Sequence, residues 1–455
     1  MTLSIFDSKS QELRTFSPIT PGRANLYVCG PTVQSAPHVG HLRSAVAFDI
    51  VANWMRFGHS LEVTLVRNVT DIDDKILVNA AEQNLDWQTL AATVEREFNR
   101  VYADLAALAD LTPHATEHIP GMIALIERLV ERGHAYQAQD GSANVFFDSS
   151  SWPAYGELTN QSIDNMDGED VASHGRRRAT DFALWKATKP DEPASAAWPS
   201  PWGPGRPGWH IECSAMTREV LGEHFDIHGG GLDLRFPHHE NELAQSRAAG
   251  FEFANYWMHN GLVTVSGQKM SKSLGNGVSV EELFAQGSAA AVRYWLASAH
   301  YRSTLDYSPS AIAEAASAVS RLQNFVKRAG DDQSEPSAND LPAPFVAAMN
   351  ADFNVPAALA VLHDSVRVGN SKLDSNADAA PEARAVRAML RALNLDLTAQ
   401  KVADAALAAR VEELIAQRAA ARADRNFGLA DEIRQQIAQL GVTIEDTPTK
   451  TTWSL

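Results

Sequence analysis

The chain has 455 residues, of which 45% are hydrophobic and 21% are charged, and this length predicts two to four domains rather than one core. No stretch approaches the ~20 apolar residues of a membrane helix, and residues 1–7 lack the basic and apolar parts of a signal peptide, so we expect a cytoplasmic protein without membrane contact. The formal net charge of -17 excludes a generally basic surface, so any RNA contact must use local patches.

The first hundred residues alternate between strand and helix patterns. A short apolar strand over residues 26–29 ends at Gly30. Pro37 is expected in the first turn of the next helix, because its missing N–H would be unpaired there anyway, and Gly58 closes that helix. A second strand follows over residues 61–66. A parallel crossover of this kind predicts an open α/β sheet with ligands at the carboxyl ends of its strands.

The middle of the chain interrupts this sheet pattern. Residues 85–132 are helical in pattern, and residues 141–205 are irregular and rich in turn formers. We interpret both as an insertion within the sheet domain. Strand patterns return at residues 225–227 and 261–265, and the pattern is mostly helical from residue 288 onward.

The helical part predicts several local features. Asn354 is expected to cap a helix that has Pro356 in its first turn. Connectors are expected over residues 330–344 and 371–381, and a short strand over residues 442–444. Apolar side chains with a 3.6-residue period predict three packed helix faces: Ile312, Val319, Leu322 and Val326; Leu407, Val411 and Leu414; and Ala430, Ile433, Ile437 and Leu440.

The first motif that carries chemistry is the segment from Pro37 to His41. His38 and His41 are three residues apart at a helix start, so both should project from one face. Helix N-termini attract phosphate, two imidazoles can donate to a triphosphate, and Gly40 leaves space for a base or ribose. On its own, this pair is more typical of two surface histidines on an amphipathic helix.

A second motif favours the interpretation of His38 and His41 as part of a nucleotide site. The sequence Lys269-Met270-Ser271-Lys272-Ser273 forms a polar loop bounded by glycines, which can close over phosphates and place an ammonium on a departing pyrophosphate. Together the two segments resemble the paired signature motifs of class I aminoacyl-tRNA synthetases, with Val39 in place of the commoner Ile. The resemblance implies catalytic roles for His38, His41, Lys269 and Lys272. It also implies ATP binding, with Mg²⁺, at Gly40, His41, Ser271 and Lys272.

Candidate metal ligands lie elsewhere in the chain. Its two cysteines are Cys29 and Cys213, and His238 and Glu242 are four residues apart on a helix expected to open at Pro237. These four side chains would make a tetrahedral set of the zinc type. His239 serves as well as His238 by spacing. Two core cysteines and a helix-capping histidine pair remain the alternative.

The amino-acid sequence around these residues resembles that of cysteinyl-tRNA synthetases. The similar segments are residues 27–30, 208–216, 225–231 and 236–242. The resemblance implies one Zn²⁺ per chain, held by Cys29, Cys213, His238 and Glu242. It places Thr70, Trp209 and Asp233 in or near the amino-acid pocket. One departure is Gln34-Ser35, where the family often has an aromatic residue and an acid, which puts fine contacts in doubt.

The implied reaction joins L-cysteine to AMP with ATP, releases pyrophosphate, and then transfers cysteine to the 3′ end of tRNA(Cys). A zinc-bound thiolate would explain rejection of serine, because an apolar pocket separates such similar side chains by only ~1–3 kcal/mol. Four protein ligands normally make a closed zinc site. The resemblance therefore requires a weak ligand, for which Glu242 is the candidate, or a fifth position for the substrate sulfur.

The resemblance also implies a division into domains and a monomeric chain. Residues 1–95 and 206–290 would form the Rossmann-like parallel-sheet catalytic domain, and residues 96–205 an inserted connective segment. An all-α C-terminal region would follow, with a tRNA-contacting domain over residues 291–400 and a small anticodon-binding domain over residues 401–455.

Three other functions fit part of the pattern. A related family joins cysteine to an amino sugar in mycothiol synthesis and would share both signatures and the thiolates. Glu242 after the histidine pair, and the added tail, favour the synthetase. A zinc hydrolase could use the cluster of histidines, but would have no use for the lysine loop. A non-catalytic, zinc-stabilised RNA-binding protein is the third alternative.

Overall fold

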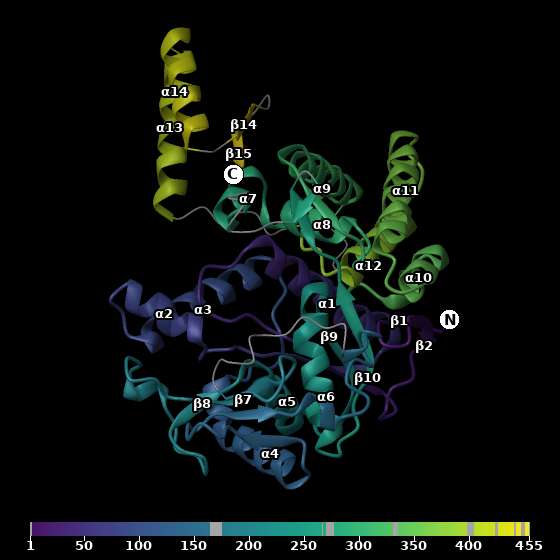
Figure 1. Ribbon diagram of the computed structural model, residues 1–455. Helices are drawn as coiled ribbons and strands as arrows, with labels where there is room; N and C mark the ends of the chain where they lie inside the picture. Colours follow the sequence, from purple (N-terminus) through teal and green to yellow (C-terminus); the bar gives the residue numbers. More distant parts are fainter. Residues whose placement is uncertain are drawn as a thin grey trace.

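The central element is a four-stranded parallel sheet (Figure 1). The computed structural model describes residues 2–163, 175–265, 267–269, 277–330, 335–397, 405–423, 426–440, 443–446 and 451–454. The sheet has the order β10-β9-β3-β4, and every neighbouring pair is parallel. Its strands are β3 (Arg23–Val28), β4 (Glu62–Arg67), β9 (His224–Gly231) and β10 (Phe253–Asn260). The predicted Rossmann-like sheet is thus confirmed.

β10 was not predicted from the sequence, and the strand predicted at residues 261–265 was only partly right. Only Val263–Val265 of that range is a strand, β11, and it belongs to a separate three-stranded sheet with β12 (Gln268–Lys269) and β13 (Leu305–Tyr307). β10 was overlooked because its sequence mixes apolar with polar side chains. The sheet buries polar groups such as His259 and Asn260 at the end of this strand, which hydrophobic patterning alone does not predict.

Helix α1 (Val39–His59) connects β3 to β4 and packs against the sheet. It begins two residues after Pro37, so the prediction that this proline lies in its first turn was wrong. The His38 side chain caps the helix instead, because its imidazole accepts a hydrogen bond from the Gly40 N–H. Cap hydrogen bonds of this kind satisfy the unpaired N–H groups of a first turn.

The insertion contains both helices and a second sheet. Helix α2 (Asp74–Glu82) precedes it, and the helices of the insertion are α3 (Trp87–Asp104) and α4 (Ile119–Glu131). An antiparallel sheet follows, made of β5 (Ala135–Gln137), β6 (Val145–Phe147), β7 (Phe182–Ala187) and β8 (Gly205–Pro207). The prediction that residues 141–205 are irregular was therefore only partly right, because β6 and β7 lie within this range. Strands of three to six residues among many turn formers are too short to show alternation, and their pairing is decided across the sheet.

Two helices complete the region around the parallel sheet and carry candidate site residues. They are α5 (Trp209–Leu221) and α6 (Glu240–Ala248). A π-helical turn over Arg235–His239 precedes α6. His238 therefore lies in this turn rather than in a regular helix opened by Pro237, although it still contacts Glu242. A small N-terminal hairpin, β1 (Ser4–Asp7) with β2 (Glu12–Thr15), packs beside β10.

The C-terminal region is helical, as predicted. It contains α7 (Val280–Gln286), α8 (Ala289–Ser298), α9 (Pro309–Ala329), α10 (Ala343–Asn350), α11 (Val355–Asp374) and α12 (Ala380–Ala392). The Asn354 side chain caps α11 through the Ala357 N–H, as expected. Residues 371–381 do not form one long connector, because α11 continues to Asp374 and α12 begins at Ala380.

The last part is a small unit with its own core. Helices α13 (Ala405–Ala423) and α14 (Phe427–Gln439) pack through Val411, Leu414, Ile433 and Ile437. Leu440, which was predicted on the same face, is 38% exposed. A hairpin of β14 (Thr443–Asp446) and β15 (Thr451–Ser454) follows, so the predicted short strand has a partner. Among the described helices, none is both long and apolar enough to cross a membrane.

Candidate active site and metal centre

A cavity of about 700 Å³ opens at the carboxyl edge of the parallel sheet. Its lining includes residues at or just after the ends of all four strands: Cys29 and Gly30, Arg67, Gly231, and Asn260. The N-terminus of α1 forms another part of its wall. This is the position in which open parallel sheets bind their ligands, because the strand order and the crossovers leave a crevice there.

Both histidines of the first motif line this cavity. Their rings are stacked, with centroids 3.8 Å apart. His38 Nδ1 accepts from the Gly40 N–H at 3.1 Å, and His41 Nδ1 accepts from the His38 N–H at 3.2 Å. An imidazole whose Nδ1 accepts carries its neutral-form proton on Nε2. Each ring therefore presents an Nε2–H donor at a helix N-terminus, where anions are favoured.

The second motif is described only at its two flanks. Residues 270–276, which include Ser271 and Lys272, lie outside the described residues, as does the side chain of Lys269. On one flank, β12 ends at Lys269, and on the other an isolated backbone bridge joins Ser279 to His38. Ser279, which follows the second motif by six residues, therefore lies beside the start of the first motif.

Four buried donor groups lie together at the base of this region. The Cys29 and Cys213 sulfurs are 3.7 Å apart, and the Cys29 sulfur is 3.3 Å from Glu242 Oε1. The same carboxylate oxygen is 3.0 Å from His238 Nε2. All four ligand atoms lie within 4.8 Å of one another and could hold one metal ion. The sequence analysis selected these residues, and the fold brings them together from β3, α5 and the start of α6.

The electrostatics of this cluster suit a cation. Burial raises the pKa of both thiols, Cys29 and Cys213, above their ordinary value. Burial also lowers the pKa of His238 to about 3, which leaves a neutral imidazole. Coordination to a divalent cation deprotonates such thiols outright. The positive charge of the cation then balances the negative charge of the buried thiolates. Two thiolates, one imidazole and one carboxylate form a donor set of the tetrahedral zinc type.

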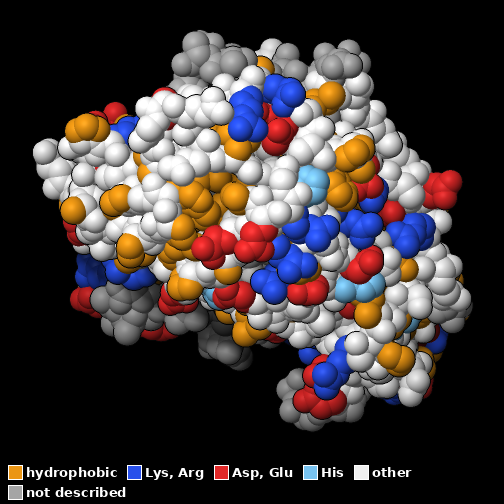
Figure 2. Space-filling view, turned by 60° about the horizontal axis from the view of Figure 1, so that its bottom comes forward, with side chains coloured by type: hydrophobic (Ala, Val, Ile, Leu, Met, Phe, Trp, Pro, Cys, Tyr) orange, Lys and Arg blue, Asp and Glu red, His pale blue; other side chains and the backbone are white. Residues whose placement is uncertain are grey.

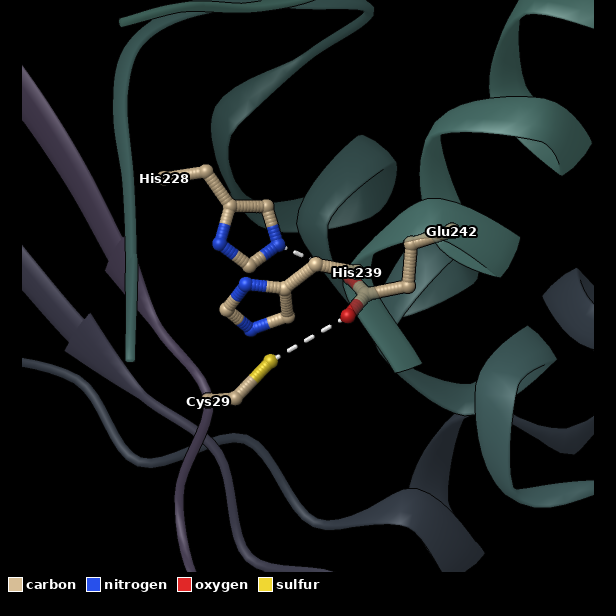
Figure 3. A group of neighbouring side chains, drawn as sticks. All are labelled: Cys29, His228, His239 and Glu242. Atoms are coloured by element: carbon tan, nitrogen blue, oxygen red, sulfur yellow. Dashed lines mark hydrogen bonds and ion pairs between the residues drawn. The ribbon is translucent and has the colours of Figure 1, made fainter. Parts of the chain in front are cut away.

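A second candidate set shares two of these residues (Figure 3). Cys29, His228, His239 and Glu242 also lie within 4.8 Å of one another and are buried. In Figure 3 the two carboxylate oxygens of Glu242 point to different partners. Oε2 is 2.8 Å from His228 Nε2, while Oε1 faces Cys29. The chemistry favours the first set, because two thiolates compete for zinc better than one.

The three predicted pocket residues occupy different environments. Trp209 and Asp233 line the cavity, and the Trp209 indole stacks on His238 at a centroid distance of 4.1 Å. Thr70 is buried and donates to Glu212 Oε2 at 3.1 Å. Among the described residues, Thr70 is not part of the cavity wall, so it lies behind the pocket rather than in it.

The cavity also contains residues that the sequence analysis did not single out. Lys186 on β7 reaches it from the insertion, where its ammonium pairs with Asp74 at 2.7 Å. Asn260 enters at the end of β10. Neither belongs to a local motif, and each is brought in by a strand that was not predicted.

This fold and site define the catalytic domain of a class I aminoacyl-tRNA synthetase. A family model described as "tRNA synthetases class I (C) catalytic domain" matches residues 15–317. The model of the DALR domain matches residues 344–417, and that of the "Cysteinyl-tRNA ligase anticodon binding domain" matches residues 404–453. A solved methionyl-tRNA synthetase from Mycobacterium tuberculosis, bound by methionyl-adenylate, shares the fold with a TM-score of 0.57 at 17% identity. That match covers 81% of this chain and 89% of the other.

The relatives narrow the class to one family. A cysteine–tRNA ligase from Clavibacter sepedonicus is 54% identical over 100% of this chain and 99% of its own length. Another, from Leifsonia xyli subsp. xyli, is 53% identical, with 100% of both chains covered. The chain therefore belongs to the cysteine–tRNA ligase family.

Proposed function

We propose that this chain activates L-cysteine with ATP, releasing pyrophosphate, and transfers the cysteine to the 3′ end of tRNA(Cys). Membership of the family makes the chain an ATP-dependent ligase. The observation that carries the proposal is that one continuous cavity contains both parts of the candidate site. It joins the His38–His41 pair to Trp209, Asp233 and the edge of the buried four-donor cluster.

The nucleotide is assigned to the α1 end of the cavity. The Nε2–H groups of His38 and His41 would donate to the phosphates of ATP as charge develops in the transition state. Gly40 has no side chain, so a ribose or base can approach its backbone. A Cβ at this position would also lie only 3.0 Å from the His38 ring. Lys269, Ser271 and Lys272 would close over the triphosphate from the adjoining loop, with Mg²⁺ as its counter-ion.

The substrate side chain is assigned to the buried cluster, held by Cys29, Cys213, His238 and Glu242. One zinc ion per chain, when bound there, would supply a soft centre that prefers the cysteine thiolate to the serine hydroxyl. His228 holds Oε2 of Glu242, which leaves Oε1 facing the other donors. We infer that Glu242 offers one oxygen and is the weakest ligand. That arrangement leaves the donor set open to the substrate sulfur.

The rest of the amino acid is assigned to the cavity wall. The exposed Asp233 carboxylate would pair with the substrate ammonium, and the Trp209 indole would cover the substrate while it fixes the His238 ring by stacking. Thr70 would act indirectly, because it holds the buried Glu212 beside the pocket.

We also propose the domain division given by the sequence and a monomeric chain. In it, residues 1–95 and 206–290 make adenylate, with residues 96–205 inserted between them. Residues 291–400 contact the tRNA and residues 401–455 read its anticodon. A chain truncated near Lys401 should then keep cysteine-dependent pyrophosphate exchange but lose most tRNA charging through weaker tRNA binding. Equal charging by the truncated chain would remove the tail from recognition.

The decisive experiment is ATP–pyrophosphate exchange across the amino acids. Cysteine should support exchange, with serine weaker by several orders of magnitude, since a hydroxyl is a poor substitute for a thiolate at a soft metal. Comparable exchange with serine would overturn the proposed role of the cluster. Ligation of cysteine to an amino sugar, with no charging of tRNA(Cys), would assign the chain to the mycothiol relative instead.

A further inference from the structure

A single arginine inside the fold joins two walls of the catalytic cavity. Arg43 lies on α1, two residues after His41, and is only 1% exposed. On the face shown in Figure 2, Lys and Arg side chains lie among Asp and Glu. Arg43 differs, because its hydrogen bonds within the described residues all go to backbone carbonyls. Buried charges are usually paired with an opposite charge, and departures from such rules are expected at functional positions.

The carbonyls belong to the end of α8 and to the segment that follows it. Nη1 of the guanidinium donates to the Leu296 carbonyl in the last turn of α8. Nη2 lies 2.7 Å from the His300 carbonyl oxygen, and 3.2 and 3.4 Å from those of Ala299 and Tyr301. The last carbonyls of a helix lack partners within it and form the negative end of its dipole, so they stabilise a cation. Burial lowers the pKa of Arg43 to about 10, which leaves the side chain charged at neutral pH.

The same segment supports the opposite wall of the cavity. The Tyr301 carbonyl also accepts a hydrogen bond from the Gly261 N–H at 2.7 Å. Gly261 lines the cavity directly after β10. A Cβ on Gly261 would lie 2.3 Å from the Ser303 carbonyl oxygen, so the two backbones are in close contact. Residues 299–303 are therefore packed against the end of β10.

The chain then continues into the strands beside the second motif. The Leu305 N–H donates to the Leu262 carbonyl at 3.0 Å, where β13 begins to pair with β11. β11 in turn pairs with β12, which ends at Lys269, the first residue of the second motif. Helix α1 packs on both α8 and β11. Arg43 therefore connects the helix of the first motif to the elements that lead into the second.

The far side of the segment is held by a buried carboxylate. The Tyr301 hydroxyl donates to Oδ1 of Asp352 at 2.8 Å, and Nε of Arg302 donates to Oδ2 at 2.7 Å. Asp352 is 3% exposed. Because residues 299–303 are held on two sides, they have little freedom to follow α1 if the contact at Arg43 is lost.

We propose that Arg43 is a positioning residue for adenylate formation, an assignment that rests on the proposed function. It sets the separation between the two imidazoles at the start of α1 and the cavity wall at the end of β10, so that the nucleotide meets both at once. Arg43 is not part of the described cavity wall, so it acts through the elements that it joins. A planar guanidinium can donate to several carbonyls in a fixed geometry, which a lysine ammonium does not reproduce.

The test replaces the guanidinium and keeps its charge. Arg43→Lys retains a cation but loses the fork that spans α8 and the following segment. The matched control is Arg293→Lys, because Arg293 is 3% exposed and also donates to backbone carbonyls, those of Leu105 and Leu393. Arg293 pairs with Asp49 on α1, and none of these partners belongs to the described cavity wall. Single-turnover adenylate formation, cysteine affinity, zinc content and Tm are measured for both variants.

Arg43→Lys should slow single-turnover adenylate formation about 10–100-fold, the scale expected when catalytic groups are slightly misplaced. Its cysteine affinity and zinc content should not change, since the four-donor cluster does not depend on this contact. Arg293→Lys should lower Tm by a similar amount and leave the rate unchanged. Gly261→Ala disturbs the same contact from the other side, because its Cβ would displace the Ser303 carbonyl, and should give the same selective loss of rate.

An unchanged single-turnover rate in Arg43→Lys would overturn the assignment and leave the proposed function standing. Equal slowing in Arg293→Lys, or a parallel loss of zinc and cysteine affinity in Arg43→Lys, would show a general loss of structure and would also overturn it. If Arg43→Lys does not fold, Gly261→Ala decides the question alone by the same outcomes. Absence of cysteine-dependent adenylate formation by the unsubstituted chain would instead overturn the proposed function.

Discussion

The two halves of the candidate site differ in how their side chains are held. The four-donor cluster is buried, and its side chains come from the end of β3, from α5, from the turn before α6 and from α6 itself. The His38–His41 pair lies at a helix start, where His38 is exposed and is held by cap hydrogen bonds. Burial suits discrimination between two small side chains, because water no longer competes for the donors. Accessibility suits a triphosphate that must enter and a pyrophosphate that must leave.

Because of this difference, substitutions in the two halves should impair different properties of the protein. Loss of a donor from the buried cluster should affect metal content and cysteine binding together. Loss of a donor at the helix start, or of Lys272, should affect the rate and leave cysteine binding in place, since these groups are proposed to act on charge that develops in the transition state.

The largest effect is expected from Cys213→Ser. Zinc affinity and cysteine binding should both fall by at least about a hundredfold, since even outer-shell partners of a metal are worth 10–100-fold. Metal analysis of the purified variant and cysteine titration give the two readouts. Thr217→Val is the control, because Thr217 lies one turn further along α5 and donates to the Cys213 carbonyl at 2.6 Å. Full zinc occupancy with unchanged cysteine affinity in Cys213→Ser would make Cys213 an ordinary core residue.

A second effect is expected from Lys272→Ala and His41→Asn. Single-turnover adenylate formation should slow about 10²–10³-fold in each, a loss typical for a donor that stabilises transition-state charge. The affinity for cysteine should hardly change, which separates these variants from Cys213→Ser. An unaltered single-turnover rate would remove the substituted residue from the mechanism.

A smaller effect is expected from His228→Gln, which tests how Glu242 is held. The variant loses the imidazole that fixes Oε2, so zinc affinity should fall about 10–100-fold while the ligands themselves stay in place. Competition with a chelator measures this change without recourse to activity. Zinc affinity equal to that of the unsubstituted chain would show that Glu242 needs no support from His228.

The smallest effect is expected from Gly40→Ala, with Gly30→Ala as its contrast. A Cβ on Gly40 meets only the His38 ring at 3.0 Å, so the exposed helix start should adjust, with the KM for ATP raised roughly threefold for a slightly displaced donor. A Cβ on Gly30 would lie 1.7 Å from the Asn68 carbonyl oxygen, which is backbone and cannot yield. Gly30→Ala should therefore lower Tm strongly, and equal stability of the two variants would contradict the contrast.

Prediction from sequence succeeded for elements whose structure is encoded in neighbouring residues. The strands at β3 and β4, the helix between them, and the cap at Asn354 all follow from neighbouring residues. It failed for β6, β7 and β10, whose pairing depends on partners distant in sequence. It also failed to find Lys186 and Asn260, because those failed strands bring them to the cavity.

The residue types of the site, and the family that they indicate, can be read from the amino-acid sequence without coordinates. Two cysteines, the motif around His38 and the pair His238 with Glu242 are local facts that need no coordinates. In contrast, the folded chain is needed to show that the sulfurs of Cys29 and Cys213, 184 residues apart in sequence, lie 3.7 Å apart, and that His228 contacts one oxygen of Glu242. The physical reason is that spacing within one element fixes a face, whereas the meeting of faces depends on how whole elements pack.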